Sequence, residues 1–180
     1  MPITGGRLHM KKVEPDLVKG IRALPSFPVV LVTAGRNIMS AAAFHFYSFE
    51  PPSVMVGIKP ENYTCELVES QGEFGINIPR ADQIALIRSC GSVSGRDCDD
   101  KYGRAGVTPF DGNRIKSSLI RECPVNIECE VVHRIQFRGS HQWFVGEVRS
   151  VHVDSDYAQD QALMYWSRAY RSVGAILEKA

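Results

Sequence analysis

The stretch that decides the fold covers residues 28–52 and reads PVVLVTAGRNIMSAAAFHFYSFEPP. An apolar, β-branched run from Val29 to Val32 leads into a turn at Ala34 to Asn37, and the small residues Ser40 to Ala43 follow. A strand that is nearly all apolar is typical of burial on both faces of a sheet. Small residues beside it would let a flat ligand lie against the main-chain amides. We therefore predict two core strands, this run and the alternating stretch Ser53 to Ile58 that follows Pro51-Pro52, joined by small residues against which such a ligand could bind.

The composition is that of an ordinary globular protein. The chain has 180 residues, of which 44% are hydrophobic and 23% charged, and its formal net charge is +1. This length suits one domain over residues 1–180, and the balanced charge indicates neither a nucleic-acid nor a membrane partner. Its five cysteines are odd in number and scattered, so they predict no disulfide framework and no metal site. With no apolar stretch of signal or membrane length, we expect a cytoplasmic protein.

The other elements are predicted from periodicity and turn residues. Residues 1–27 read as an N-terminal arm with a short helix, and residues 91–114, rich in Gly, Ser, Asp and Arg, as a long surface loop. Strands do not alternate regularly with helices, and no G-x-G-x-x-G follows the first strand. We therefore expect a β-rich α+β fold with an antiparallel barrel. The predicted strands cover 29–33, 53–59, 74–78, 115–120, 126–137 and 143–153, and the predicted helices cover 62–71, 81–90 and the C-terminal segment 154–180.

Six short motifs follow one another in an order that resembles the flavin reductase-like family. Each motif is weak alone, but their order over about residues 28–153 is a strong signal. The resemblance is closest to the flavoredoxin-like members, and it implies an FMN-binding split β-barrel with flanking helices. Besides the opening stretch, the motifs are Lys59 to Thr64, Phe74 to Asn77, Gly91 to Asp97, Glu128-Cys129, and Gly139 to His141 with Phe144 to Val148.

The resemblance assigns a role to each matching residue. In the loop, Ser94, Arg96 and Lys101 would reach a phosphate or a pyridine nucleotide. His141 would contact the nicotinamide. The helix that starts near Asn62 is suited to an anion, because its free amides and its dipole favour negative charge. The residues expected to line the isoalloxazine ring are Asn37, Met39, Ser40, Ala41, Ser48 and Phe49; those expected near the ribityl chain and phosphate are Lys59, Tyr63 and Thr64; Asn77, Ser94, Arg96 and Lys101 complete the set.

Several of these residues have a simpler interpretation, taken one by one. The Ser- and Ala-rich turn could serve tight packing alone, and Lys59 could be a solvated lysine at a strand end. The loop at 91–114 could be mobile and solvated, and His141 could be an exposed turn histidine. The order of the motifs, and not any single residue, is what favours a flavin site.

The resemblance also implies cofactors and partners. We expect FMN, or alternatively FAD, with NAD(P)H as electron donor, and a homodimer with the flavin near the subunit interface. Electrons would pass to a small-molecule or protein acceptor. The sequence shows no Ser-His-Asp order, paired carboxylates or H-E-x-x-H, and hydride transfer to a flavin requires no protein acid or base. A flavoredoxin-type electron carrier reduced by a protein donor is the second hypothesis, and a cofactor-free interaction domain is the third.

Overall fold

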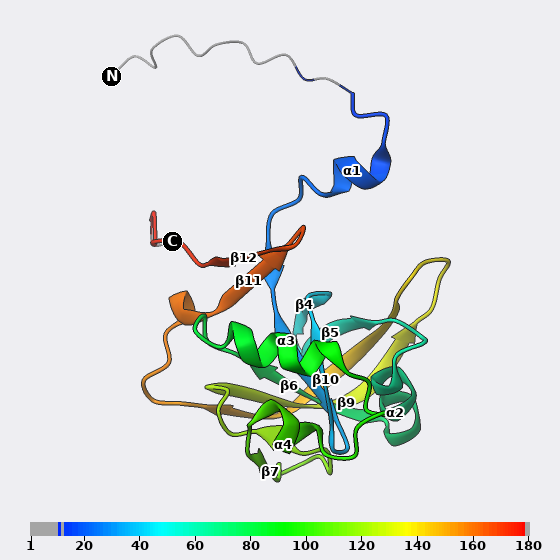
Figure 1. Cartoon of the computed structure of the whole chain (residues 1–180), viewed down its shortest axis with the longest axis vertical. Helices are drawn as coiled ribbons and strands as arrows, with labels where there is room; N and C mark the ends of the chain where they lie inside the picture. The colour runs from blue at the N-terminus through cyan, green and yellow to red at the C-terminus, as the bar shows by residue number, and fades with distance from the viewer. Residues whose placement is uncertain (1–10, 12, 179–180) are drawn as a thin grey trace.

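The computed structural model describes residues 11 and 13–178 (Figure 1). Its body is a seven-stranded sheet in the order β3-β2-β6-β9-β10-β5-β4, with every pair antiparallel. The prediction of a β-rich fold around an antiparallel split barrel is confirmed. The strands are β2 Val30–Ala34, β3 Asn37–Ala41, β4 Phe44–Phe49, β5 Pro52–Ile58, β6 Glu73–Ile78, β9 Val125–Ile135 and β10 Gln142–Val153.

The opening stretch forms both edges of this sheet. β2 and β3 are joined by a hairpin in which Gly35 has a φ of 55°, a left-handed conformation that favours glycine. β3 and β4 lie at opposite ends of the strand order, although only Ala42 and Ala43 separate them in the chain. The sheet must therefore curl until its edges meet. The Gly57 N–H of β5 donates to the Ala43 carbonyl at 2.7 Å beside this closure.

Helices cover the sheet on two sides (Figure 1). The helix predicted over 62–71 is confirmed, and it ends at Gly72, whose φ of 70° suits a glycine cap. The helix predicted over 81–90 begins and ends slightly later. A short helix also interrupts the predicted loop, because the Asp100 carboxylate accepts from the Gly103 N–H and caps it. These helices are α2 Tyr63–Gln71, α3 Ile84–Ser92 and α4 Lys101–Ala105.

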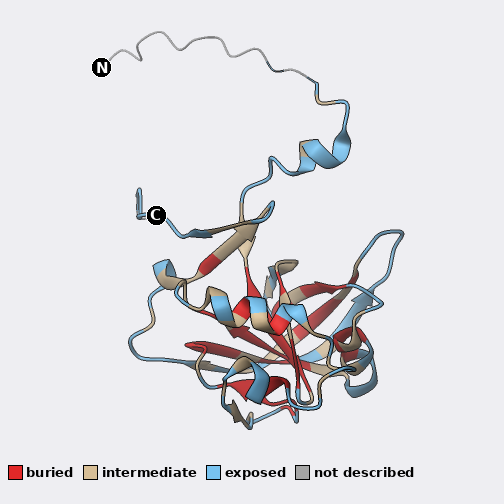
Figure 2. Cartoon of the chain, viewed as in Figure 1, coloured by how far each residue is buried: buried red, intermediate tan, exposed pale blue. Residues whose placement is uncertain are grey.

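β2 is the centre of the hydrophobic core. Val30 and Val32 pack in a cluster that includes Val68 of α2, whereas Leu31 packs in a second cluster that includes Ile87 of α3. Figure 2 shows the buried residues concentrated in the strands. Burial on both faces explains why Val29 to Val32 are apolar at consecutive rather than alternate positions, and each such side chain stabilises the fold by about 1.5–3 kcal/mol.

The predicted C-terminal helix is wrong. The segment forms a hairpin whose turn places Ser167 and Arg168 at positive φ, and the rings of Tyr165 and Tyr170 lie 4.9 Å apart across it. The first hairpin strand also pairs with a segment that precedes the main sheet, so a partner distant in sequence overrides the helical spacing. The strands of this small sheet are β1 Phe27–Pro28, β11 Leu163–Trp166 and β12 Ala169–Ser172, and a 3-10 turn, η1, covers Gln159–Gln161.

The strand predicted over 115–120 is mostly irregular. Only Leu119–Ile120 (β8) is a strand, and it pairs with Pro109–Phe110 (β7). The N–H groups of residues 115–117 donate to carboxylates instead of to a neighbouring strand. That of Ile115 binds Glu128, and those of Lys116 and Ser117 bind Glu73. Hydrogen bonds to side-chain carboxylates thus replace the strand-to-strand hydrogen bonds that the pattern predicted.

The N-terminal arm carries one short helix, α1 Leu17–Ile21, which stands apart from the body in Figure 1. Its apolar side chains are open to solvent, and those of Leu17 and Ile21 are 77% and 55% exposed. Residues 1–10 and 12 of the predicted arm lie outside the described residues.

Three further features bear on function. All five cysteines are free thiols, as the scattered spacing predicted. Within residues 11 and 13–178, no cluster of His, Cys, Asp and Glu could hold a metal ion. In the same range, no helix has the length and apolar character needed to span a membrane.

Candidate functional site

A cavity of about 300 Å³ lies between β3, the start of α2, and the end of α3 with the segment that follows it. Hydroxyl and amide groups dominate its wall. It brings together residues that the sequence separates by more than sixty positions. The predicted site residues that line it are Asn37, Met39, Ser40, Tyr63, Thr64, Ser94 and Lys101.

β3 supplies the first wall, and Asn37 is its most informative residue. The side chain is almost fully buried, with 5% exposed, and its Nδ2 donates to the Thr64 hydroxyl at 2.7 Å. Its Oδ1 is buried and accepts no hydrogen bond from any described residue. Because nearly all buried polar groups are paired, this oxygen marks a place where a ligand donor would bind.

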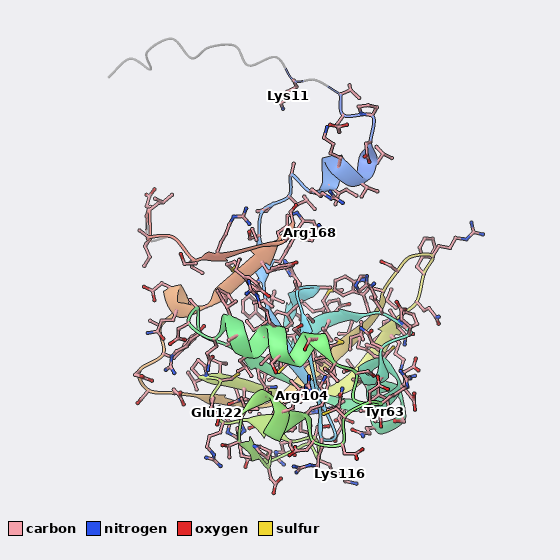
Figure 3. The ribbon with its side chains drawn as sticks, in the orientation of Figure 1. Lys11, Tyr63, Arg104, Lys116, Glu122 and Arg168 are labelled. Carbon is pink, nitrogen blue, oxygen red and sulfur yellow. The ribbon has the colours of Figure 1, made fainter. Side chains whose placement is uncertain are left out.

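The start of α2 supplies the second wall. Figure 3 shows Tyr63 where this helix begins. In the described chain no side chain caps the first turn, and Asn62, the residue at the cap position, donates instead to the Met39 sulfur at 3.2 Å. The first amides of α2 therefore lack a side-chain acceptor. With the helix dipole, they favour an anion at this end of the cavity.

The last turn of α3 and the segment after it supply the third wall, and two glycines, Gly91 in the helix and Gly95 beyond it, let this wall approach β3 closely. A Cβ at Gly91 would overlap the Ser40 hydroxyl, and one at Gly95 would overlap Asn37 Oδ1. Arg96 holds the outer side of this segment, because its guanidinium donates to Glu66 at 2.7 Å and lies 5.1 Å from the centre of the Tyr63 ring. Arg96 is therefore bound to α2 rather than directed into the cavity.

The family is decided by a comparison with known proteins. The family profile described as "Flavin reductase like domain" matches residues 22–174. The chain belongs to the flavin reductase-like family. This confirms the resemblance that the order of motifs indicated.

Individual flavin reductase-like proteins support the assignment. Flavoredoxin of Desulfovibrio vulgaris (Miyazaki F) superimposes with a TM-score of 0.80 at 30% identity, covering 95% of this chain and 97% of that one. The uncharacterized protein YddH of Escherichia coli is 34% identical over 78% of this chain and 77% of its own length. The NADH-dependent FMN reductase AsuE2 of Streptomyces nodosus subsp. asukaensis is 26% identical, with 83% and 82% covered.

The cavity of this flavin reductase-like protein fits FMN by its chemistry. The unpaired Asn37 Oδ1 requires a hydroxyl or N–H donor, which a ribityl chain carries. The uncapped amides of α2 and the Thr64 hydroxyl suit a phosphate. A small apolar hollow of about 120 Å³, lined by Ala41, Tyr165 and Tyr170, adjoins at Ser40 and suits part of an aromatic ring system.

Ser48 and Phe49, which were expected at the isoalloxazine ring, line neither the cavity nor the adjoining hollow that contains Ala41. Ser48 is occupied within its own strand end, where its hydroxyl donates to the Glu50 carbonyl at 3.1 Å and accepts from the Glu50 N–H. Phe49 is 86% exposed, and its ring centre lies 4.3 Å from that of Phe46. Neither residue contributes to the described site within one chain.

Lys59 lies just beyond the cavity lining. Its ammonium is 3.8 Å from the Glu61 carboxylate, and both side chains are at least half exposed. Glu61 itself lines the cavity. The geometry therefore leaves Lys59 near the anion-binding end without placing it in contact.

Asn77 belongs to the core and not to the site. It is fully buried, and its amide nitrogen donates to Leu31 O at 3.0 Å and to the Thr33 hydroxyl at 3.3 Å. Its Oδ1 accepts from the Ile120 N–H at 2.9 Å and from Asn126 Nδ2 at 2.8 Å. Protein groups use its full hydrogen-bonding capacity, so the predicted cofactor contact is corrected to a structural one.

Lys101 borders the cavity, but its ammonium is bound to protein. Nζ donates to the carbonyl oxygens of Ile38, Cys90 and Val93. Burial lowers the pKa of this lysine, and the neighbouring thiols of Cys90 and Cys98 oppose the shift. The expected contact with phosphate or pyridine nucleotide is therefore corrected, because no donor is left for it.

His141 lies in a separate hollow of about 360 Å³ on the β9–β10 hairpin, beside Phe137 and Trp143. Its Nδ1 is 2.8 Å from the Ser140 hydroxyl. This hollow and the cavity share no lining residue. A nicotinamide contact by His141 therefore stays a prediction.

The sequence reasoning missed Asn62, Gly91 and Gly95 as wall residues. The glycines carried a signal, since glycine in a long loop often allows a close backbone approach. Asn62 carried the expected helix-cap signal, but its side chain serves the cavity wall instead.

Proposed function

We propose that this protein is an FMN-binding oxidoreductase that takes electrons from NAD(P)H and passes them through the flavin to a downstream acceptor. The observation that carries the proposal is the buried, unpaired Asn37 Oδ1 in the cavity of a flavin reductase-like chain. An unsatisfied buried acceptor costs about 1–3 kcal/mol, and a ligand hydroxyl would remove this cost. The cavity thus contains a buried acceptor, Asn37 Oδ1, that a donor group of the ligand would pair.

Each wall of the cavity would bind a different part of the ligand. Asn37 and Ser40 would receive the hydroxyl-bearing chain, and the amides at the start of α2, with Thr64 and Ser94, would receive the phosphate. Lys59 would add positive charge from the end of β5. The hollow at Tyr165 and Tyr170 would shield one part of the ring from water. FAD carries the same ribityl and phosphate groups, so the extracted flavin must be identified.

No protein group needs to act as an acid or a base in this proposal. When bound, the flavin supplies the hydride and electron chemistry through its ring. The chain binds and orients it and excludes water from it, through hydroxyls, amides and one unpaired amide oxygen. This explains why a site without paired carboxylates or a metal centre can support an oxidoreductase.

A flavoredoxin-type electron carrier, reduced by a protein donor, is the second candidate. Two observations favour it: the 30% identity to flavoredoxin and the separation of His141 from the cavity. A carrier needs no nicotinamide pocket beside its flavin.

Anaerobic reduction separates the two functions. We expect the purified protein to bind FMN and to lose its flavin absorbance in the visible when NADH or NADPH is added, with dithionite as the positive control. Bleaching by dithionite alone would favour the carrier. A protein that binds no added FMN would contradict both functions and favour the interaction domain.

We also propose that the protein is a homodimer. The support is the group of exposed aromatic side chains on the edge strand β4, where Phe46, Tyr47 and Phe49 are 46%, 53% and 86% exposed. Exposed apolar groups of this kind mark interaction sites. Sedimentation velocity should give the mass of two chains, and Phe49→Glu should shift it toward one. A monomeric wild type at micromolar concentration would refute the proposal.

A further inference from the structure

Lys101 is buried without a carboxylate partner. Its residue is 5% exposed, and none of the ion pairs among the described residues includes it. A buried charge is costly unless other polar groups replace its water. A fold that needed only packing at this position could use methionine at lower cost. The charge of the Lys101 ammonium therefore indicates a structural role that an apolar side chain could not fill.

Three main-chain carbonyl oxygens surround the ammonium, and the elements they belong to indicate what this role is. Nζ donates to Ile38 O of β3 at 2.5 Å, to Cys90 O in the last turn of α3 at 3.0 Å, and to Val93 O at 2.7 Å. An ammonium has three donors, so all of them are used. Carbonyls in the last turn of a helix lack intrahelical partners and attract a cation. The side chain thus ties the end of α3 to β3.

Residues 91–95, which begin after Cys90 and run past Val93, belong to the third wall of the cavity. Gly91 and Gly95 lie against Ser40 and Asn37 of β3, so a small displacement of segment 91–95 would open or fill the space beside Asn37 Oδ1. Arg96 fixes only the outer end of this segment, through Glu66 and the Glu61 carbonyl. Lys101 fixes its inner side.

We propose that Lys101 is a positioning residue that holds segment 91–95 against β3 and thereby shapes the flavin cavity. It acts through the backbone and does not contact the ligand phosphate. The proposal rests on the proposed function only for the identity of the ligand. The tie between α3 and β3 is a property of the protein alone.

Two ligands distinguish positioning from phosphate contact. Riboflavin carries the ring and ribityl chain of FMN but no phosphate. If Lys101 shapes the wall, Lys101→Met should weaken FMN and riboflavin by a similar factor of about ten, or about one unit in log Kd. Lys59→Met is the matched control, since a phosphate contact should weaken FMN and leave riboflavin unchanged. A loss confined to FMN in Lys101→Met would overturn the proposal.

Hydrogen exchange gives a readout that needs no ligand. In Lys101→Met the amides of segment 91–96 should exchange at least about tenfold faster, whereas those in the middle of α2 should not change. Unchanged exchange in segment 91–96 would overturn the proposal. If wild-type protein bound neither flavin, the proposed function would fail and the exchange experiment would still decide the role of Lys101. If Lys101→Met does not fold, Lys101→Gln, which keeps two donors, replaces it and should show a smaller effect of the same kind.

Discussion

Asn77→Leu is expected to lower the free energy of unfolding by about 3–5 kcal/mol, because several buried groups lose their partners together. The Ile120 N–H and the Asn126 amide donate to Asn77 Oδ1, and Leu31 O accepts from its nitrogen. These groups belong to β2, β8 and β9, so the single side chain joins three strands to β6. Urea unfolding at pH 7 measures the loss.

The same substitution at Asn37, which is also buried, should change stability little and FMN binding strongly. Asn37→Leu removes an acceptor that is already unpaired and one hydrogen bond to Thr64, so we expect a stability change within about 1 kcal/mol. Its FMN Kd should rise about tenfold, because the ligand donor loses its acceptor. The folded fraction of Asn77→Leu should keep wild-type FMN affinity. Reduced FMN affinity in Asn77→Leu with unchanged stability would restore Asn77 as a cofactor contact.

Glu128→Gln is expected to cost about 3 kcal/mol of stability at pH 7, since it replaces a buried charge that the surrounding groups are arranged to bind. The Glu128 carboxylate is fully buried, yet it accepts from the N–H groups of Asn113, Arg114 and Ile115 and from His152 Nε2. It fixes the turn before β8. Glu130→Gln is the matched control on the same strand, and its exposed pair with Arg149 should contribute less than about 1 kcal/mol.

The same carboxylate should make stability fall in acid. Burial alone would raise the pKa of Glu128, but hydrogen bonds from the Asn113 N–H, from His152 and from the next two amides lower it to about 2. The unfolded chain therefore binds a proton first as the pH falls, and the stabilisation present above about pH 4.5 is lost toward pH 2. About 2 kcal/mol should disappear between pH 7 and pH 3. Urea unfolding at both values should show this part of the acid loss in wild type and not in Glu128→Gln. Equal acid losses would contradict the assignment.

Local patterns were sufficient for most of the main sheet. The apolar run at β2, the alternation in β5 and the turn residues before β10 each depend on neighbours in sequence, so their strands were predicted within a few residues. Asn62 and Gly72, which flank α2, were equally local signals for where this helix begins and ends. Helix-compatible spacing failed at residues 160–177, because Tyr165 and Tyr170 pair across a hairpin and β11 binds β1.

The candidate site was predicted only in part, for the same reason. Asn37, Ser40, Tyr63, Thr64 and Ser94 do meet at one cavity, as the family order of motifs implied. Asn77 and Lys101 were expected beside the cofactor, but their polar atoms bind main-chain groups that lie up to 63 residues away in the chain. A sequence shows that a residue can donate or accept. It does not show which partner reaches it.

Sequence alone determined the family, the antiparallel sheet and the central buried strand, because periodicity and the order of motifs are properties of the chain itself. Tertiary structure decided which polar groups remain free for a ligand. Asn77 and Asn37 are the same residue type in one sheet, on the two strands that flank β2, yet four protein partners surround the first and the oxygen of the second has none. Hydrogen-bond satisfaction depends on groups that folding brings together, and that difference distinguishes a core residue from a site residue.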